Sequence, residues 1–263
     1  LTSVCLHADL LAEPGLAESF RLVWYDSRGS GLSDRNATDF SMDARMRDLE
    51  AVLAGGVTEP FVLMGTYDGT PIAATYAATR PERVSHLILV DGWSKFSDYL
   101  EAPTAAAEAA MRAQDWVLYT ETLARVFIGF DDPELAEQFG AFMRECVEPE
   151  ALRKAYQAHE GIDTTGLLSQ ITAKTLVLHN RNNRFLPVDS GRRLATRIPG
   201  AQFMLIDDMS HHHVPRLAAE FVMEDQDMPA EGTAVSGFRT VLFTDIVAHT
   251  EMMARLGAAK GRD

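Results

Sequence analysis

Residues Val62–Ala78 read VLMGTYDGTPIAATYAA and set the architecture expected for the chain. The first part is apolar, and the Ala-rich part that follows Gly69 is typical of a helix. Gly65 and Gly69 stand two residues before and two residues after Tyr67. Small residues at these two positions allow a sharp turn where a strand and a helix approach closely. The stretch therefore predicts a strand, a tight bend at Tyr67 and a helix.

Outward from this stretch, short apolar runs alternate with helical patterns. Ser41 is a candidate cap for a helix that runs to about Leu53, and Thr70–Thr79 is a second helix that ends before Pro81. Continuous apolar runs favour strands buried on both faces of a parallel sheet. The candidate strands are Ser3–His7, Arg21–Tyr25, Pro60–Met64, Val84–Val90, Thr175–His179 and Gln202–Ile206. This alternation predicts an α/β fold with a mostly parallel sheet of about six strands.

One long helical insertion interrupts the alternation after the strand that ends at Val90. It spans residues 94–169 and contains four candidate helices: Ala105–Arg112, Trp116–Phe127, Pro133–Cys146 and Pro149–His159. A helical block between two core strands predicts a cap over the carboxyl ends of the strands, where open α/β sheets bind ligands.

Composition narrows the classes of partner. The 263 residues carry a formal net charge of -14, and such an acidic surface repels nucleic acid and anionic membranes. Cys5 and Cys146 match no metal-ligand spacing, and no apolar run reaches the ~20 residues of a membrane span. We therefore expect a cytoplasmic protein with a small-molecule partner, no cofactor and no metal, and we leave a homodimer open.

Five motifs in order resemble the α/β-hydrolase family and cover roughly residues 3–222. They are the bend around Tyr67, the loop Tyr25–Arg35, the helix end and strand from Pro81 to Asp91, Leu176–Pro187 and Gln202–His211. The resemblance implies an α/β-hydrolase core formed by residues 1–93 and 170–223, with residues 94–169 as its helical cap.

The catalytic triad that the resemblance implies is altered at two of its three positions. The family serine falls on Tyr67, the family acid falls on Asn183, and the family histidine is retained as His211. Acyl transfer needs a compact hydroxyl that the histidine deprotonates beside the oxyanion donors, and a phenol carries its oxygen beyond that point. An amide in place of the acid costs a serine triad a factor of ~10⁴ in rate. Ordinary serine hydrolysis is therefore not expected.

Other residues could replace the missing groups. Asp91 ends a strand from which some family members supply the acid, although a strand-end aspartate is also common. Asp68 would be a nucleophile only if the bend shifted by one residue, and Tyr67 itself would need strong activation, so an aromatic that fills the pocket is the simpler interpretation. His7 and Ala8 match the family's oxyanion loop, with the backbone N–H of Asp68 as the second donor.

The last residues resemble a different family. Residues 224–236 read as an acidic linker. Thr240–Glu251 is similar to the first strand of class III adenylate/guanylate cyclase domains, in which the aspartate matching Asp245 binds a metal ion. Residues 237–263 are therefore expected to be the truncated start of a cyclase-like domain, as in bacterial hydrolase–cyclase fusions. An ordinary C-terminal strand is the alternative. His211–His213 are three consecutive residues that do not converge on one ion.

Two functions remain open from the sequence. The first is a hydrolase of small esters or lactones with an atypical triad, possible because His211 and the oxyanion-type loop are retained. The second is a catalytically inactive ligand-binding domain that regulates a fused cyclase, favoured by the changes at Tyr67 and Asn183.

Overall fold

A computed structural model describes residues 20–128, 132–207, 213–224 and 239–244 of the chain. These residues form a six-stranded sheet in which every neighbouring pair of strands is parallel. The strand order is β1-β6-β2-β3-β4-β5. Their bounds are β1 Phe20–Tyr25, β2 Phe61–Thr66, β3 Val84–Val90, β4 Lys174–Asn180, β5 Gln202–Ile206 and β6 Arg239–Thr244. The predicted α/β fold with a parallel sheet of about six strands is confirmed.

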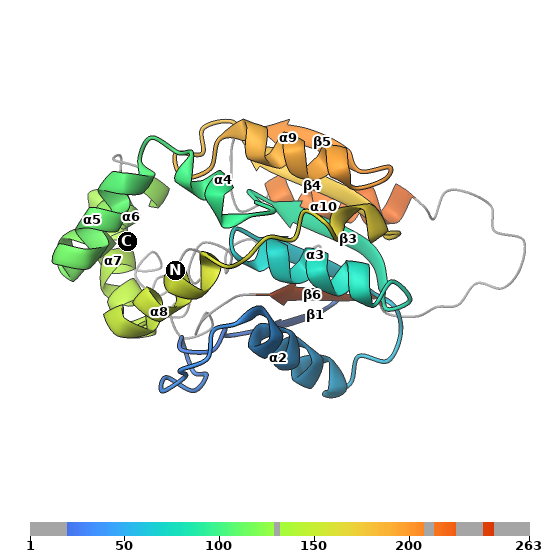
Figure 1. Cartoon of the computed structure of the whole chain (residues 1–263), viewed down its shortest axis with the longest axis horizontal. Coiled ribbons are helices and arrows are strands. Elements are labelled where there is room, and N and C mark those ends of the chain that lie inside the picture. The colour runs from blue at the N-terminus through green and yellow to red at the C-terminus, as the bar shows by residue number, and fades with distance from the viewer. Residues whose placement is uncertain (1–19, 129–131, 208–212, 225–238, 245–263) are drawn as a thin grey trace, which may run out of the picture.

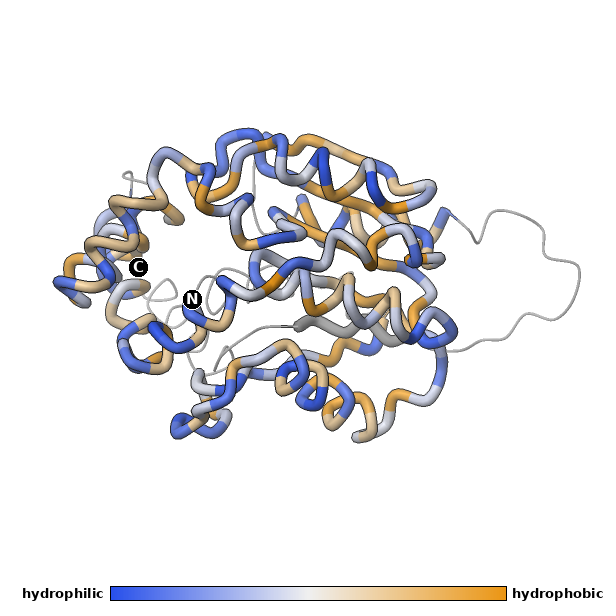
Figure 2. The backbone as a smooth tube through the Cα atoms, in the orientation of Figure 1, coloured by the Kyte–Doolittle hydropathy of each residue, from blue (hydrophilic) through white to orange (hydrophobic). Residues whose placement is uncertain are grey.

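Helices cover both faces of the sheet (Figure 1). One face packs against α2 (Met42–Ala54), α3 (Gly69–Thr79) and α9 (Val188–Arg197), and the other packs against α10 (His213–Met223). Strand β2 is buried along its whole length, as expected for a strand enclosed on both faces. Figure 2 shows hydrophobic positions spread over both the strands and the helices that cover them. In the part of the chain that the structure describes, no helix is long and apolar enough to cross a membrane.

Local sequence explains where the first helix begins. The hydroxyl of Ser41 accepts a hydrogen bond from the backbone N–H of Ala44 at 3.3 Å, so it caps α2 as predicted. This satisfies one of the N–H groups that an isolated helix end leaves without a partner.

Five helices lie between β3 and β4, in the stretch expected to form a cap. They are α4 Phe96–Leu100, α5 Ala105–Gln114, α6 Trp116–Ile128, α7 Pro133–Cys146 and α8 Pro149–His159, and a 3-10 turn, η2 Leu168–Gln170, leads back to the sheet. Figure 1 shows α5–α8 beyond one end of the sheet, and we call α4–α8 the helical insertion. The sequence pattern predicted α5–α8 closely but not the short α4.

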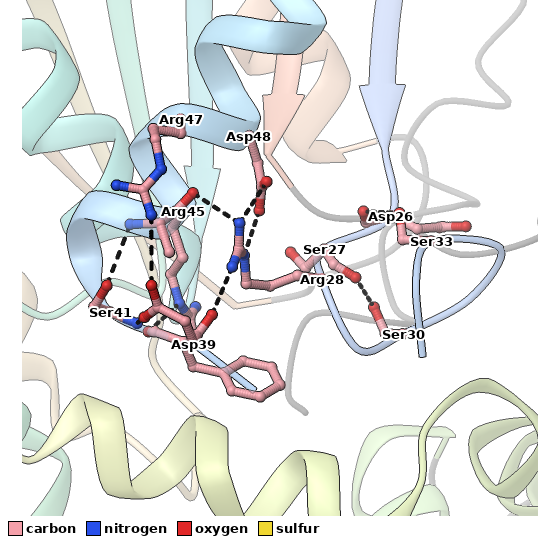
Figure 3. Close-up of polar contacts among 12 residues, drawn as sticks. Asp26, Ser27, Arg28, Ser30, Ser33, Asp39, Ser41, Arg45, Arg47 and Asp48 are labelled. Carbon is pink, nitrogen blue, oxygen red and sulfur yellow. Dashed lines mark hydrogen bonds and ion pairs between the residues drawn. The ribbon is translucent and has the colours of Figure 1, made fainter. Parts of the chain in front are cut away.

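The loop after β1 is held against α2 by one arginine (Figure 3). Arg28 donates two hydrogen bonds to the carboxylate of Asp48, at 2.6 and 2.7 Å, and a third to the backbone carbonyl of Asp39 at 2.6 Å. This paired geometry suits the planar guanidinium, and the hydrogen bond to Asp48 raises the pKa of Arg28. The loop is thereby fixed next to the carboxyl ends of the strands.

The C-terminal strand is part of the segment 237–263 that is expected to begin a cyclase-like domain. Strand β6 lies inside the sheet, where it pairs with β1 on one side and with β2 on the other. A short apolar strand with both edges paired satisfies its backbone groups, which a detached strand could not do. The predicted strand Ser3–His7, the linker 224–236 apart from Glu224, and residues 245–263 lie outside the described residues.

Candidate active site

The candidate site begins at the bend between β2 and α3. Tyr67 has a φ of +45°, a conformation that side-chain-bearing residues rarely adopt and that concentrates at functional sites. A Cβ added at Gly65 would lie 2.8 Å from the Cβ of Ala73 and 2.8 Å from the carbonyl oxygen of Gly69. Only glycine fits there, because α3 passes so close to the end of β2. The sharp turn expected from the spacing of small residues is present.

Two side chains hold the hydroxyl of Tyr67. It donates a hydrogen bond to Oδ2 of Asp91 at 3.3 Å and accepts one from Nδ2 of Asn183 at 3.3 Å. The amide oxygen of Asn183 accepts from the backbone N–H groups of Phe185 and Leu186, at 2.8 and 3.0 Å, so its NH₂ group must face the phenol. The three residues come from the carboxyl ends of β2, β3 and β4, which meet at one edge of the sheet.

The surroundings of Tyr67 oppose its ionisation. Its side chain is buried, and burial raises its pKa well above 10, followed by the effect of the nearby carboxylate of Asp91. Burial also raises the pKa of Asp91, although His179 opposes this. A phenolate would be desolvated and next to a carboxylate, so the phenol keeps its proton.

Asp91 is held rigidly at the end of β3. It is completely buried, and its φ of +47° is unusual for a residue other than glycine. Its Oδ1 atom accepts a hydrogen bond from the backbone N–H of Asn180 at 2.8 Å and lies 3.7 Å from Nδ1 of His179. Nε2 of His179 is 3.2 Å from the carbonyl oxygen of Leu186, and a carbonyl can only accept, so that nitrogen carries the proton.

A second polar group lies beside the bend. The carboxylate of Asp68 is 3.7 Å from Arg45 and 3.7 Å from His159, and Arg45 donates to Nε2 of His159 at 3.0 Å. Burial, followed by the positive charge of Arg45, lowers the pKa of His159 from 6.5 to about 3. His159 is therefore neutral at physiological pH, and Arg45 neutralises Asp68. This arrangement reduces the nucleophilicity of the Asp68 carboxylate.

Aromatic side chains leave little room at this place. The cavity next to Tyr67 and Asp68 has a volume of about 20 Å³. It is lined mainly by Trp93, Phe96, Tyr99, Tyr156 and Phe185. A single water needs ~10–15 Å³, so the cavity accommodates about one water molecule.

The structure brings together three of the predicted site residues, Tyr67, Asp91 and Asn183, with Asp68 adjacent to them. His211, His7 and Ala8 lie outside the described residues. No group of three His, Cys, Asp or Glu residues that could hold a metal ion occurs among the residues the structure describes.

None of Arg45, His159 and His179 was identified as a site residue from the sequence. Arg45 lies on α2 and His159 at the end of α8. Their contact with Asp68 depends on tertiary packing, and no local sequence motif predicts it.

Comparisons with known proteins agree with this architecture. Residues 8–124 match a family model described as alpha/beta hydrolase fold. The "Putative carbamate hydrolase RutD" of Klebsiella pneumoniae (strain 342) is 28% identical over 207 residues, which cover 73% of this chain and 75% of that protein.

Solved structures show the same fold. A thermophilic esterase from Thermogutta terrifontis superposes with a TM-score of 0.68 at 22% identity, over 84% of this chain and 86% of that one. The enol-lactonase from Burkholderia xenovorans LB400 superposes with a TM-score of 0.65 at 18% identity, over 85% of this chain and 86% of that one. The chain thus has an α/β-hydrolase fold, and hydrolases are among the proteins to which it is similar.

Proposed function

We propose that this protein is a ligand-binding α/β-hydrolase-fold domain of the cytoplasm that does not hydrolyse its ligand by the serine mechanism. One observation carries the proposal: the hydroxyl of Tyr67, which stands at the bend between β2 and α3, is hydrogen-bonded by Asp91 and Asn183. In that position a nucleophile would have to be free to lose its proton and to approach a carbonyl carbon.

The proton of Tyr67 argues against attack by this residue. A nucleophilic hydroxyl is activated by a base that removes its proton as the new bond forms. Burial and Asp91 instead raise the pKa of Tyr67 and so favour the neutral phenol. Asn183 carries no charge with which to stabilise an imidazolium, as the acid of a serine triad does.

The space around Tyr67 argues in the same direction. A ligand pocket for a small organic molecule typically has a volume of a few hundred Å³. The cavity next to Tyr67 has about 20 Å³, because the phenol and its aromatic neighbours occupy the region. An ester or lactone could reach this place only after Tyr67 moved.

The resemblance of residues 240–251 to a cyclase domain supports a regulatory role. Thr240–Glu251 resembles the start of a cyclase domain, and strand β6 contains the first part of this segment. Thr244 is opposite Gly65 in the sheet, two residues before Tyr67. We infer that ligand binding among the helices that lie beyond the carboxyl ends of the strands would affect this segment and, in a fused protein, the cyclase.

Hydrolysis of a small ester or lactone is the second candidate function. The sharp bend with positive φ at residue 67 and the hydrolase relatives favour it. Its atypical set would be Tyr67, His211 and an acid from Asp91 or Asn183, with oxyanion donors from the backbone around His7, Ala8 and Asp68.

Turnover of p-nitrophenyl acetate and γ-butyrolactone by the full chain separates the two functions. We expect the wild type and the His211→Ala variant to show equal rates, close to the reaction without enzyme. Tyr67→Ser should raise esterase turnover above both, because it restores a compact hydroxyl. Wild-type turnover that disappears in His211→Ala would overturn the proposal and favour the hydrolase.

A further inference from the structure

Helix α5 contains a carboxylate that the candidate active site does not use. The side chain of Glu108 is only 4% exposed, although it carries two oxygens that need hydrogen-bond donors. It lies in the helical insertion, away from the bend at Tyr67.

The two oxygens of Glu108 have unequal surroundings. Oε1 accepts from the hydroxyl of Tyr119 at 2.9 Å, the hydroxyl of Tyr156 at 3.1 Å and the guanidinium of Arg112 at 3.0 Å. Oε2 is buried and has no hydrogen-bond partner. An orphan carboxylate oxygen in an apolar interior is costly, and in native proteins it calls for an explanation such as an absent ligand.

A cavity adjoins this carboxylate. It has a volume of about 130 Å³ and is lined by Glu108 together with mainly apolar side chains, Met111, Leu123, Val126 and Phe185 among them. An engineered apolar cavity of about 150 Å³ binds benzene, so this one suits a single small ring. Phe185 also borders the small cavity at Tyr67 and packs on Phe127 at 5.2 Å, so it separates the two spaces.

We propose that this cavity binds a small, uncharged, ring-sized molecule whose single O–H or N–H group donates a hydrogen bond to Oε2 of Glu108. The inference deepens the proposed ligand-binding function by giving it a place and a ligand chemistry.

The charges around Glu108 favour a neutral donor. Arg112 forms an ion pair with Glu108, and its guanidinium lies 3.5 Å from the centre of the Tyr156 ring. Arg184 also lines the cavity. A cationic ligand would meet two positive charges against one carboxylate, and an anion would be repelled by the negative charge of Glu108.

The donors on Oε1 are permanent at physiological pH. Burial, followed by the charge of Glu108, raises the pKa of Tyr119 and of Tyr156 well above 10. Both phenols therefore keep their protons and keep Oε1 engaged. A ligand donor is left with Oε2.

Pyrrole and furan provide the test, because they have nearly the same shape and only pyrrole carries an N–H donor. Titration of each into the full chain by isothermal calorimetry should give at least about tenfold tighter binding of pyrrole, the effect expected for a hydrogen bond to a charged group. Equal affinities, or no binding of pyrrole to the folded wild type, would overturn the proposal.

Glu108→Gln sharpens the test. The amide oxygen must stay with the three donors on the Oε1 side, so the NH₂ group takes the place of Oε2. The N–H of pyrrole would then face another donor, whereas the ring oxygen of furan could accept a hydrogen bond from the NH₂ group, so the preference should reverse in favour of furan. A variant that still prefers pyrrole tenfold would overturn the assignment of Oε2. Glu150→Gln, an exposed glutamate of α8, is the matched control and should bind as the wild type does.

Val126→Phe provides a second test that does not depend on the folding of the Glu108 variant. Val126 lines the cavity and the larger ring takes up part of its volume, so both ligands should lose binding. Unchanged pyrrole binding would place the site elsewhere. These readouts do not depend on turnover: an active esterase that binds pyrrole as described would overturn the proposed function and leave this inference intact.

Discussion

His159 should make the stability of the folded protein depend on pH between neutrality and mild acid. In the native state its ring is buried next to the positive charge of Arg45, and its pKa is about 3 instead of 6.5. The unfolded chain binds a proton at this position below pH 6.5, and the native state does not. Since the folded pKa is depressed, the stabilisation is complete above pH 6.5 and is lost as the pH falls toward 3.

The size of the effect follows from the two pKa values. Proton binding by the unfolded chain alone gives a slope of up to ~1.4 kcal/mol per pH unit within this window. Between pH 8 and pH 5, the free energy of unfolding should therefore fall by about 2 kcal/mol because of His159 alone. That is a large fraction of the ~5–15 kcal/mol by which domains are stable.

The perturbation is His159→Gln, whose side-chain oxygen can still accept the hydrogen bond from Arg45. Urea unfolding of wild type and variant at pH 8, 6.5 and 5 measures the free energy of unfolding at each pH. The variant should lose about 2 kcal/mol less than the wild type between pH 8 and pH 5. Parallel pH curves for the two proteins would refute the reasoning, because His159 would then titrate alike in the folded and unfolded chain.

Four further substitutions test the packing around the bend, in α3 and in the loop after β1. Tyr67→Phe should lower the free energy of unfolding, measured in urea, by about 1–3 kcal/mol, because Asp91 and Asn183 lose their hydrogen-bond partner. Tyr76→Phe is the control: it removes a buried hydroxyl that has no hydrogen-bond partner, so it should be neutral or stabilising in the same assay. Arg28→Lys should lower the melting temperature, at a cost of about 1–2 kcal/mol, since an ammonium cannot reproduce the paired contact with Asp48; an unchanged melting temperature would contradict this. Gly65→Ala should lower the free energy of unfolding by roughly 1–3 kcal/mol, because the added methyl group would lie 2.8 Å from atoms of α3. A urea midpoint and a circular dichroism spectrum equal to those of the wild type would contradict this, because α3 would then have moved aside.

Much of the fold followed from sequence pattern because buried strands and amphipathic helices have distinct periodicities. Helices α5–α8 were predicted nearly to the residue, and Pro133 and Pro149 mark the first positions of α7 and α8. Helix α4 was not predicted, because five residues carry no readable helical period. The place of β6 was not predicted either, since strand order depends on which edges meet in space.

Some residues of the candidate site could also be predicted from the sequence, and others could not. Tyr67, Asp91 and Asn183 could be brought together from the sequence, because each follows a parallel strand and such strands end at one edge. The cluster of Arg45, Asp68 and His159 could not. Its members come from α2, the bend and the insertion, and only the packing of those elements brings them within 4 Å.

The position of β6 has a consequence for how the protein is made. Among the described strands, β1 is synthesised first and has β6 as its one hydrogen-bonded neighbour, while β6 is synthesised last. At roughly 5–20 residues per second, a ribosome needs of the order of ten seconds or more to reach Arg239 after Tyr25. During that interval the edges of β1 and β2 that later enclose β6 stay open, and open strand edges are templates for aggregation. Nascent chains, and fragments cleaved ahead of Arg239, should therefore need chaperone protection that the finished chain does not.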